Sequence, residues 1–491
     1  MITRFPVASR LMFENRMPRY EILSEDAMAV FERGWRRLIS EMGVEFLHDD
    51  AVARFREAGQ SVDGNVVRFD PEFVLEQVAK APAEFELAAR NPDRTINVGG
   101  SHMFFAPTQG PPFVRLGDER REATMADFEQ LVRLSQVFDE LDTPGGLCCE
   151  PNDRPLDSRH LDMLLAVQTL TDKPYLGAVI TGEAAHDSIA MTDILFGGSD
   201  PEHPEARVFA VVNANSPLRF DTRMLEAMMV YAEAGQVNVI TPFLLMGAMA
   251  PVSTPAALVQ QTTEALAGLC LTQLVRPGAP VILGSFLSHT DMQSGSPGFG
   301  GPESALGLLA SGQIARRFGL PWRAGGGFLT SSQTPDAQAA YEGLNTMLPA
   351  FLAGANYVEH AAGWLESGLV AGFEKFIVDI EMLRVLKEEF RPMEIDEASL
   401  AFDAHQEVGY GGHFFGAAHT LERFRDCFYR PLLSSTENFE RWQSRGGLDA
   451  ADRAARLWRE ALDRYEQPVL DPDVRAALDA YVVRRRAELG D

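Results

Sequence analysis

Polar side chains at the ends of apolar segments are the groups of this sequence best placed for chemistry. His360 follows one apolar segment, and Asn213 and Asn215 close another. Residues two apart point the same way from a strand, so these two amides favour a shared ligand. The alternatives without a ligand are that the two asparagines belong to a turn at Asn-Ser-Pro, and that the histidine bonds a backbone carbonyl. Groups of this kind hold and orient a small polar molecule.

The usual signatures of a self-contained catalyst are missing. There is no GxSxG motif for a serine nucleophile, and the glycine-rich segment Gly295–Ser304 fits neither phosphate-binding spacing. Cys148 and Cys149 are adjacent, so on a strand they would face opposite ways, and no metal-ligand spacing accompanies them. We therefore expect no metal site and no catalytic residue in the strict sense. The residues favour a site that positions a molecule for chemistry done by another component.

The elements that must position these groups form an alternating series. Eight apolar, strand-like segments are separated by helical ones, with Pro and Gly at most junctions. This pattern predicts a parallel sheet, and eight strands predict a closed (β/α)8 TIM barrel. An open doubly wound sheet is the alternative, although the dinucleotide-binding turn common in such sheets is missing. The predicted strands are Met103–Pro107, Gly146–Glu150, Pro174–Ile180, Val208–Ala214, Val237–Gly247, Pro280–Phe286, Pro321–Phe328 and Asn356–Trp364.

Three regions follow from this alternation: a mixed helix and strand extension over 1–100, the barrel over 101–397, and a glycine-rich segment with helices over 398–491. Ser24 is placed to cap a helix that ends at Gly43. Thr124 and Asp127 form a capping box for a helix ending near Leu141. The extensions leave the barrel as the region that holds the candidate site.

Composition narrows the environment and the partners. The 491 residues carry 44 Lys plus Arg against 70 Asp plus Glu, a net charge of −26, which disfavours nucleic acid and anionic lipid. Four cysteines without a CxxC pair fit a reducing compartment. The N-terminus lacks the apolar core of a signal peptide, and no apolar run is long enough for a membrane helix. A cytoplasmic protein, and for a barrel with long extensions a homo-oligomer, is the expectation.

Four segments carry a resemblance to a known family. They are AGGGFLTSSQTPDAQAAYE (Ala324–Glu342), ANYVEHAAGWLESGLVAGFEKFIVDIEM (Ala355–Met382), GYGGHFFGAAHTLERF (Gly409–Phe424) and YEQPVLDPDV (Tyr465–Val474). Together they resemble the trimethylamine methyltransferase family of corrinoid-dependent methylamine and betaine methyltransferases. Archaeal trimethylamine enzymes of that family carry pyrrolysine in the region corresponding to Gly325–Ser332. Here this region holds standard residues only, as in the branch that includes glycine betaine methyltransferases.

The resemblance implies a (β/α)8 barrel that transfers a methyl group from a small quaternary amine, glycine betaine first, to cobalt(I) on a partner corrinoid protein. The nearest match to the cobalamin motif DxHxxG is DAHQEVG (Asp403–Gly409), where Val408 replaces the required glycine. We therefore expect the corrinoid to be carried by the partner. Quaternary ammonium ions bind aromatic faces, and a substrate carboxylate needs polar donors. The predicted substrate-binding residues are Phe105, Glu150, Asn213, Asn215, His289, Phe328, Glu359, His360 and Trp364; those predicted to face the corrinoid or partner are Gly325, Gly326, Gly327, Gly411, Gly412 and His413.

Other functions remain open at this level. Trimethylamine, proline betaine or carnitine is an alternative substrate. A betaine-binding or sensing barrel without transfer activity is a second reading, and an unrelated barrel enzyme such as a lyase is a third. Packing in the barrel is an equally good explanation for any single aromatic residue among the candidates.

Overall fold

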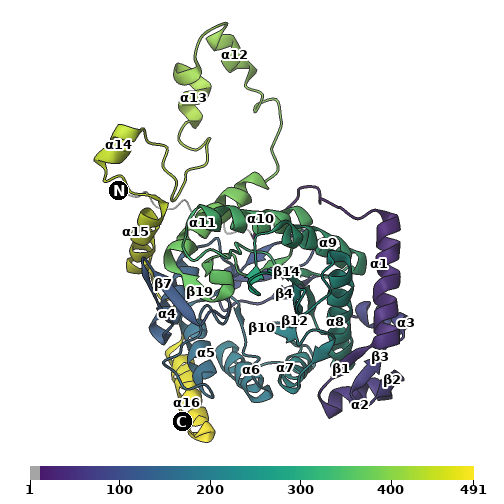
Figure 1. Ribbon diagram of the computed structural model, residues 1–491. Helices are drawn as coiled ribbons and strands as arrows, with labels where there is room; N and C mark the ends of the chain where they lie inside the picture. The colour runs from purple at the N-terminus through teal and green to yellow at the C-terminus, as the bar shows by residue number, and fades with distance from the viewer. Residues whose placement is uncertain (1–11, 491) are drawn as a thin grey trace.

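The computed structural model describes residues 12–490, and its centre is a closed barrel of eight positions, seven filled by parallel strands and one by an irregular segment (Figure 1). The ladder runs from β9 through β10, β12, β13, β16 and β17 to β6, all parallel. β14 continues β13 beside the end of β12. The strands are β6 (Phe104–Phe105), β9 (Tyr175–Leu176), β10 (Val208–Ala214), β12 (Val237–Met246), β13 (Val281–Gly284), β14 (Phe286–Thr290), β16 (Trp322–Ala324) and β17 (Tyr357–Val358).

Residues 142–147 occupy the second position in the barrel without regular strand structure. The Asp142 N–H donates to Phe105 O (2.9 Å), and the Leu176 N–H donates to Gly145 O (3.2 Å). The segment is thus bonded to β6 on one side and to β9 on the other, which closes the ring. The predicted strand Gly146–Glu150 is wrong in two respects. The segment at this position of the barrel has no regular strand structure, and it begins several residues before Gly146. Two consecutive glycines disfavour a regular strand here.

Both faces of the barrel strands are apolar because the inside is packed and helices cover the outside. In β10, Phe209 faces the inner core, while Val208 and Val212 belong to the outer one. The inner core also holds Phe104, which stacks on Tyr357 with ring centroids 4.5 Å apart. A hairpin of β4 (Phe85–Leu87) and β5 (Ile96–Val98) contributes apolar side chains to this same core. The lower half of the barrel is therefore filled.

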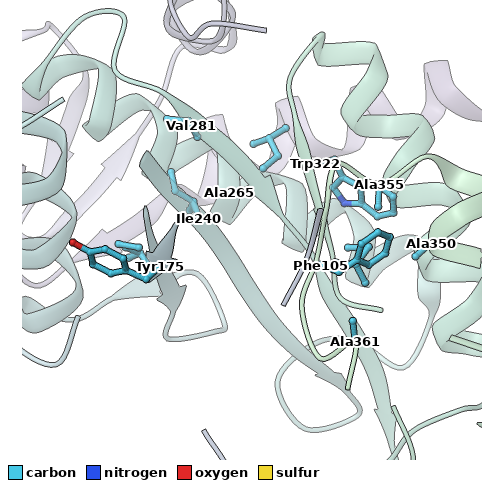
Figure 2. Close-up of a cluster of buried hydrophobic side chains, with 14 of the residues drawn as sticks. Phe105, Tyr175, Ile240, Ala265, Val281, Trp322, Ala350, Ala355 and Ala361 are labelled. Atoms are coloured by element: carbon cyan, nitrogen blue, oxygen red, sulfur yellow. The ribbon is translucent and has the colours of Figure 1, made fainter. Parts of the chain in front are cut away.

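Eight helices surround the strands and bury the outer core, part of which is drawn in Figure 2, where Phe105, Ile240, Val281 and Trp322 are labelled. The predicted capping box at Thr124 and Asp127 is present, although its helix ends at Val137. The helices are α4 (Met125–Val137), α5 (Arg159–Leu170), α6 (Gly182–Phe196), α7 (Thr222–Glu233), α8 (Thr254–Val275), α9 (Pro302–Phe318), α10 (Ala337–Ala353) and α11 (Phe373–Glu389).

The N-terminal region attaches to the barrel through a small sheet of order β11-β1-β3-β2. Its first strand pairs in parallel with β11, which lies in a barrel loop just before α7. Ser24 caps the first helix as predicted, and a π-helical turn, Leu38–Met42, continues it to Gly43. The elements are α1 (Glu25–Arg37), β1 (Val44–Phe46), α2 (Asp49–Glu57), β2 (Ser61–Asp63), β3 (Val66–Arg68), α3 (Pro71–Val78) and β11 (Arg219–Phe220).

A second small sheet, of order β18-β19-β7-β8, forms where the strands of the barrel end. It joins the loop after β6 to the loop after β17, because β7 pairs in parallel with β19. We call this end of the barrel the mouth. The strands are β7 (Phe113–Leu116), β8 (Glu119–Glu122), β18 (Trp364–Leu365) and β19 (Val370–Gly372), and a two-residue strand, β15 (Pro297–Gly298), pairs with β14 nearby.

The C-terminal region first leaves the barrel and then returns to it (Figure 1). The outlying part holds α12 (Phe402–Val408), α13 (Ala418–Arg423) and α14 (Phe439–Ser444). α15 (Ala450–Asp463) then packs on α11, and α16 (Pro472–Leu489) packs on α5 and α6. No helix within residues 12–490 is long and apolar enough to cross a membrane.

A buried carboxylate fastens the last helix to the barrel. Asp187 of α6 accepts hydrogen bonds from Tyr481 Oη (2.7 Å) and Arg485 Nε (2.7 Å) of α16. His160 Nε2 of α5 lies 2.9 Å from the other carboxylate oxygen. Although burial alone would favour the neutral acid, these donors outweigh it and lower the pKa of Asp187 to about 2.

Asp187→Asn is expected to lower the free energy of unfolding by about 2 kcal/mol at pH 7. Because the folded-state pKa is depressed, the carboxylate stabilises the protein above pH 4 and loses this effect as the pH falls toward 2. Denaturant unfolding of both proteins at a series of pH values would measure this. A difference between them that stays constant from pH 7 to pH 3 would show that the charge of Asp187 is unimportant.

Candidate functional site

A layer of polar side chains crosses the barrel interior above the filled lower half. The ladder sets Asn213 of β10 beside Thr241 of β12, and Gly284 of β13 beside Arg323 of β16. A Cβ on Gly284 would lie 2.1 Å from Thr241 Oγ1, so the glycine keeps the space between Thr241 and Arg323 open. Of these residues Asn213 is exposed, so the interior is reached by solvent from the mouth.

Arg323 and Glu359 form an ion pair inside this layer. Both side chains are almost completely buried, and Glu359 accepts from Arg323 Nη2 and from Tyr357 Oη (3.2 Å). Arg323 Nη1 donates to Ser285 O (3.0 Å), and its guanidinium lies over the Phe286 ring at 5.4 Å. Arg323 Nε is buried and has no hydrogen-bond partner among the described residues. The pair is therefore neutral overall but keeps one N–H donor unused.

His360 is held beside this pair in a strained backbone conformation. Its φ of 61° lies in the left-handed region, which costs about 1 kcal/mol or more for a residue with a Cβ. Hydrogen bonds from His360 N to Pro107 O (3.2 Å) and from Phe328 N to His360 O (3.0 Å) maintain it. Strain of this kind clusters at ligand sites.

The ring of His360 is uncharged. Burial and the neighbouring Arg323 hold its pKa well below the usual value. The Gln109 N–H lies 3.3 Å from Nδ1, and Arg323 Nη2 lies 3.3 Å from Nε2, so both ring nitrogens face N–H donors. A neutral imidazole can accept at only one of them. Nε2 is also 3.7 Å from Glu359 Oε2, so it belongs to the ion-pair cluster. Thr241 Oγ1 is also buried without a partner in residues 12–490. Arg323 Nε and Thr241 Oγ1 are thus two unused donors, which suit an anionic oxygen such as a carboxylate.

Aromatic rings form the next layer toward the mouth. The ring of Trp364 is 4.5 Å from that of His360 and 5.4 Å from that of Phe299, measured between centroids. Phe286 lies between His360 and Phe243, at 5.7 and 4.7 Å. Trp364 Nε1 donates to Thr330 O (3.1 Å), which fixes the indole. Phe243 is partly exposed toward the open interior. Such a layer suits a quaternary ammonium group.

A buried ion pair behind the mouth joins two of its loops. Lys375 and Asp379 of α11 are both fully buried and bond to each other. Lys375 Nζ donates to Phe328 O (3.2 Å), and Asp379 Oδ2 accepts from Gly363 N (2.8 Å). Desolvation raises the pKa of Asp379 to about 7 against the opposing effect of Lys375. The pair positions the backbone beside His360 and Trp364.

Several predicted residues lie in this site and several do not. Asn213, Glu359, His360 and Trp364 come together in the interior. Asn215 instead exchanges hydrogen bonds with Asp221 in the turn before α7. Glu150 pairs with Arg159 at 2.8 Å, and His289 lies at the β14–β15 hairpin, 3.7 Å from Glu303. These three belong to loops around the mouth.

Two aromatic residues require correction: alternation along β6 turns Phe105 outward, and Phe328 lies in the irregular segment that follows β16. Phe105 stacks on Phe351 in the outer core, and the inward position is that of Phe104. Phe328 also lies in the outer core, 5.7 Å from Lys375 Nζ. Neither ring lines the barrel interior.

The glycines predicted to face a partner serve other purposes. Gly325, Gly326 and Gly327 are buried, and a Cβ on Gly325 would lie 2.3 Å from Phe286 Cα. They let the chain after β16 lie against β14 and β17, so they are not an outer surface. Gly411, Gly412 and His413 are exposed, but they lie on the outlying part of the chain (Figure 1), away from the interior. Within residues 12–490, no three His, Cys, Asp or Glu side chains gather where they could hold a metal ion.

Five residues of the site are absent from the sequence-based prediction: Arg323, Thr241, Phe243, Phe286 and Phe299. Arg323 is a lone charge in an apolar segment, which is a usable signal. Thr241 and Phe243 sit two apart on the predicted strand Val237–Gly247, so the inward period could have found them. Phe299 comes from the loop Gly295–Ser304 and reaches the interior only through the fold.

Glu359→Leu is expected to lower the free energy of unfolding by about 3 kcal/mol, because it leaves the buried Arg323 uncompensated. Adding Arg323→Met should recover part of this loss, since a well-packed apolar pair can replace a buried ion pair. Glu41→Leu, in the exposed pair with Arg37, is the control and should cost less than about 1 kcal/mol. Denaturant midpoints measure all three. Glu359→Leu as stable as the parent would contradict this account of the interior.

Comparisons with known proteins by sequence and by structure both find methyltransferases. The family model of trimethylamine methyltransferase (MTTB) matches residues 6–490. A glycine betaine methyltransferase of Desulfitobacterium hafniense strain Y51 is 39% identical over 476 residues, covering 97% of this chain and 99% of the relative. A proline betaine:corrinoid methyltransferase of Eubacterium limosum is 25% identical, covering 91% and 94%. The crystal structure of the Methanosarcina barkeri monomethylamine methyltransferase (MtmB) superposes with a TM-score of 0.51 at 10% identity, covering 92% and 90%, a likeness of fold.

Proposed function

This chain belongs to the trimethylamine methyltransferase family, and on that premise we propose that it transfers a methyl group from glycine betaine to the cobalt of a partner corrinoid protein. The relatives named as betaine methyltransferases support this, one of them at 39% identity over nearly the whole chain. The observation that carries the choice of a betaine is the order of the two interior layers. Polar donors lie deep in the barrel, and aromatic rings lie nearer the mouth.

The layers match the two ends of a betaine. A carboxylate would accept from Arg323 Nε and Thr241 Oγ1, which are buried without a partner among the described residues, and would lie beside His360. The trimethylammonium group would then lie among Phe243, Phe286 and Trp364. Phe243 follows Thr241, and Phe286 follows Gly284, by two residues along their strands, so the aromatic layer is one step closer to the mouth. One N-methyl group would therefore point out of the barrel.

Methyl transfer of this kind requires little acid–base catalysis by the protein. A quaternary ammonium becomes a neutral tertiary amine as its C–N bond breaks, so the leaving nitrogen needs no proton. Cobalt(I) on the partner's corrinoid supplies the nucleophile. The residues of this chain exclude water, hold the cation and aim one methyl along the barrel axis. Positioning alone can contribute up to about 7–11 kcal/mol in favourable systems.

Charge balance within the site also fits a zwitterion. Arg323 is neutralised by Glu359, and His360 is uncharged, so the interior presents dipoles and rings with no net charge. A substrate with both charges brings its own neutrality into the buried space. A simple cation would lack an anion at the depth of the unused donors. Glycine betaine therefore ranks above trimethylamine.

The mouth offers a surface on which a corrinoid protein could dock. Ile180, Val252 and Met292 are exposed apolar residues in the loops that follow β9, β12 and β14. Val252 and Met292 lie against Gly247, just after the end of β12. Such a rim suits a transient apolar contact with the edge of a corrinoid domain. The family relative named as a corrinoid methyltransferase supports this partner.

Thr241→Val tests the deep carboxylate site. We expect kcat/KM for glycine betaine to fall about tenfold, because one hydrogen bond of about 1.4 kcal/mol is lost. With tetramethylammonium, which has no carboxylate, the same variant should lose less than twofold. Thr263→Val is the matched control, since that hydroxyl bonds Val259 O within α8, outside the barrel. Formation of methylcobalamin from cob(I)alamin, followed by absorbance, measures the rates.

The outcomes separate the alternatives. Equal losses of kcat/KM with both substrates would contradict the proposed carboxylate site. If no quaternary amine gave methylcobalamin, the proposed methyltransferase activity would be wrong. If calorimetry then showed tight binding of glycine betaine without turnover, a betaine-sensing barrel would replace the enzyme.

A further inference from the structure

Residues 391–431 form an arm that is exposed and rich in aromatic residues. The arm leaves the barrel after α11 and lies off the body of the protein (Figure 1). Only Ala404 and Ala417 are buried along it. Six of its aromatic side chains are between 42% and 110% exposed, as free as in an unfolded chain at the upper end. They are Phe402, Tyr410, Phe414, Phe415, Phe424 and Phe428.

This apolar surface is as large as a stable interface requires. At about 200 Å² for a whole aromatic side chain, the six rings expose on the order of 900 Å². A standard protein–protein interface buries roughly 800 Å² on each partner. Single exposed apolar residues are normal on a protein surface, but a continuous segment of this area marks an interaction site.

Both ends of the arm are firmly anchored. Phe390 packs against Phe351 with ring centroids 5.0 Å apart where the arm begins. Where it returns, the Glu381 carboxylate of α11 accepts from Leu432 N (2.7 Å) and Leu433 N (3.1 Å). The arm is therefore held out from a fixed base. That arrangement resembles the exchanged segments of two-fold dimers, in which each copy lends one element to the other.

The tip of the arm is built for close contact with another backbone. Gly416 has no positive φ, and a Cβ on it would meet nothing within 4 Å. Its own chain therefore gives no reason for glycine at this position. A neighbouring backbone that approaches closely would give one.

The occupant that fits best is a second copy of this chain. A corrinoid protein must bind and leave in every reaction cycle, and transient partners use small, polar interfaces, whereas permanent homodimers use large apolar ones. This step rests on the proposed function. Position points the same way: α11 ends beside the C-terminal end of α10, just before β17 begins, so the arm starts at the end of the barrel opposite to the mouth.

Charge does not distinguish the occupants. The arm carries four arginines against seven Asp and Glu residues, so it shares the acidic character of the whole chain. The size and apolar character of the exposed surface are what favour a second copy. We propose that two copies exchange these arms, each arm lying with its aromatic residues on the other copy.

The mass of the full-length chain in solution tests this, without substrate or corrinoid, so its outcome is separate from that of the transferase assay. Native mass spectrometry should give twice 54.1 kDa, or a multiple of that dimer. Phe415→Asp with Phe428→Asp should raise the dimer dissociation constant at least about 100-fold and give monomers with unchanged circular dichroism. Val469→Asp, at an exposed apolar residue outside the arm, is the matched control and should stay dimeric.

The thiol of Cys427 gives a second readout. Cys148, Cys149 and Cys270 are buried, whereas Cys427 lies in the arm and is exposed in the single chain. Maleimide should label Cys427 at least about tenfold more slowly in the parent and in Val469→Asp than in the double aspartate variant. A monomeric parent chain at micromolar concentration overturns the proposal whether or not the variant folds. So does a Cys427 that becomes protected only when the corrinoid protein is added.

Discussion

The ion pair between Arg323 and Glu359 is the interaction on which the barrel interior depends. A guanidinium so nearly removed from water is tolerated only with a counter-charge and hydrogen bonds. Glu359, Ser285 O and the Phe286 ring supply them. The pair keeps the interior polar at this level but neutral overall. Burial, together with the charge of Arg323, lowers the pKa of His360 and leaves the imidazole uncharged. The unused Arg323 Nε then becomes a fixed point for a ligand.

The layers of the barrel interior also set the orientation of a bound ligand. Its lower half is packed with rings and aliphatic side chains, its middle layer carries donors, and its upper layer carries aromatic faces. A molecule that is an anion at one end and an onium ion at the other has one favourable orientation in such a gradient. The reactive methyl is then presented at the open end, where another protein can reach it. The chain thus contributes alignment and desolvation, and the reaction itself needs only a strong external nucleophile.

Local sequence signals predicted much of the fold. The strand Val208–Ala214 has the bounds expected from its apolar run, and the caps at Ser24 and Thr124 are present because their hydrogen bonds are local. The irregular segment 142–147 was predicted poorly because neighbouring strands, not its own residues, hold it in place.

The site was predicted in part for a similar reason. His360, Glu359, Trp364 and Asn213 end apolar segments, so their position on the chain is visible. Two phenylalanines are adjacent in β6, and the register of the strand determines which of them faces inward. In this register Phe105 faces outward. Phe299 comes from a loop, and the distance of His413 from the mouth depends on where the arm leaves the barrel; neither is encoded in a local pattern.

A crystal structure with glycine betaine bound would test the central claim most directly. The account predicts its carboxylate beside His360 Nε2, Arg323 Nε and Thr241 Oγ1, with the trimethylammonium group among Phe243, Phe286 and Trp364 and one methyl facing the mouth. A betaine bound the other way round, or outside the barrel, would contradict it.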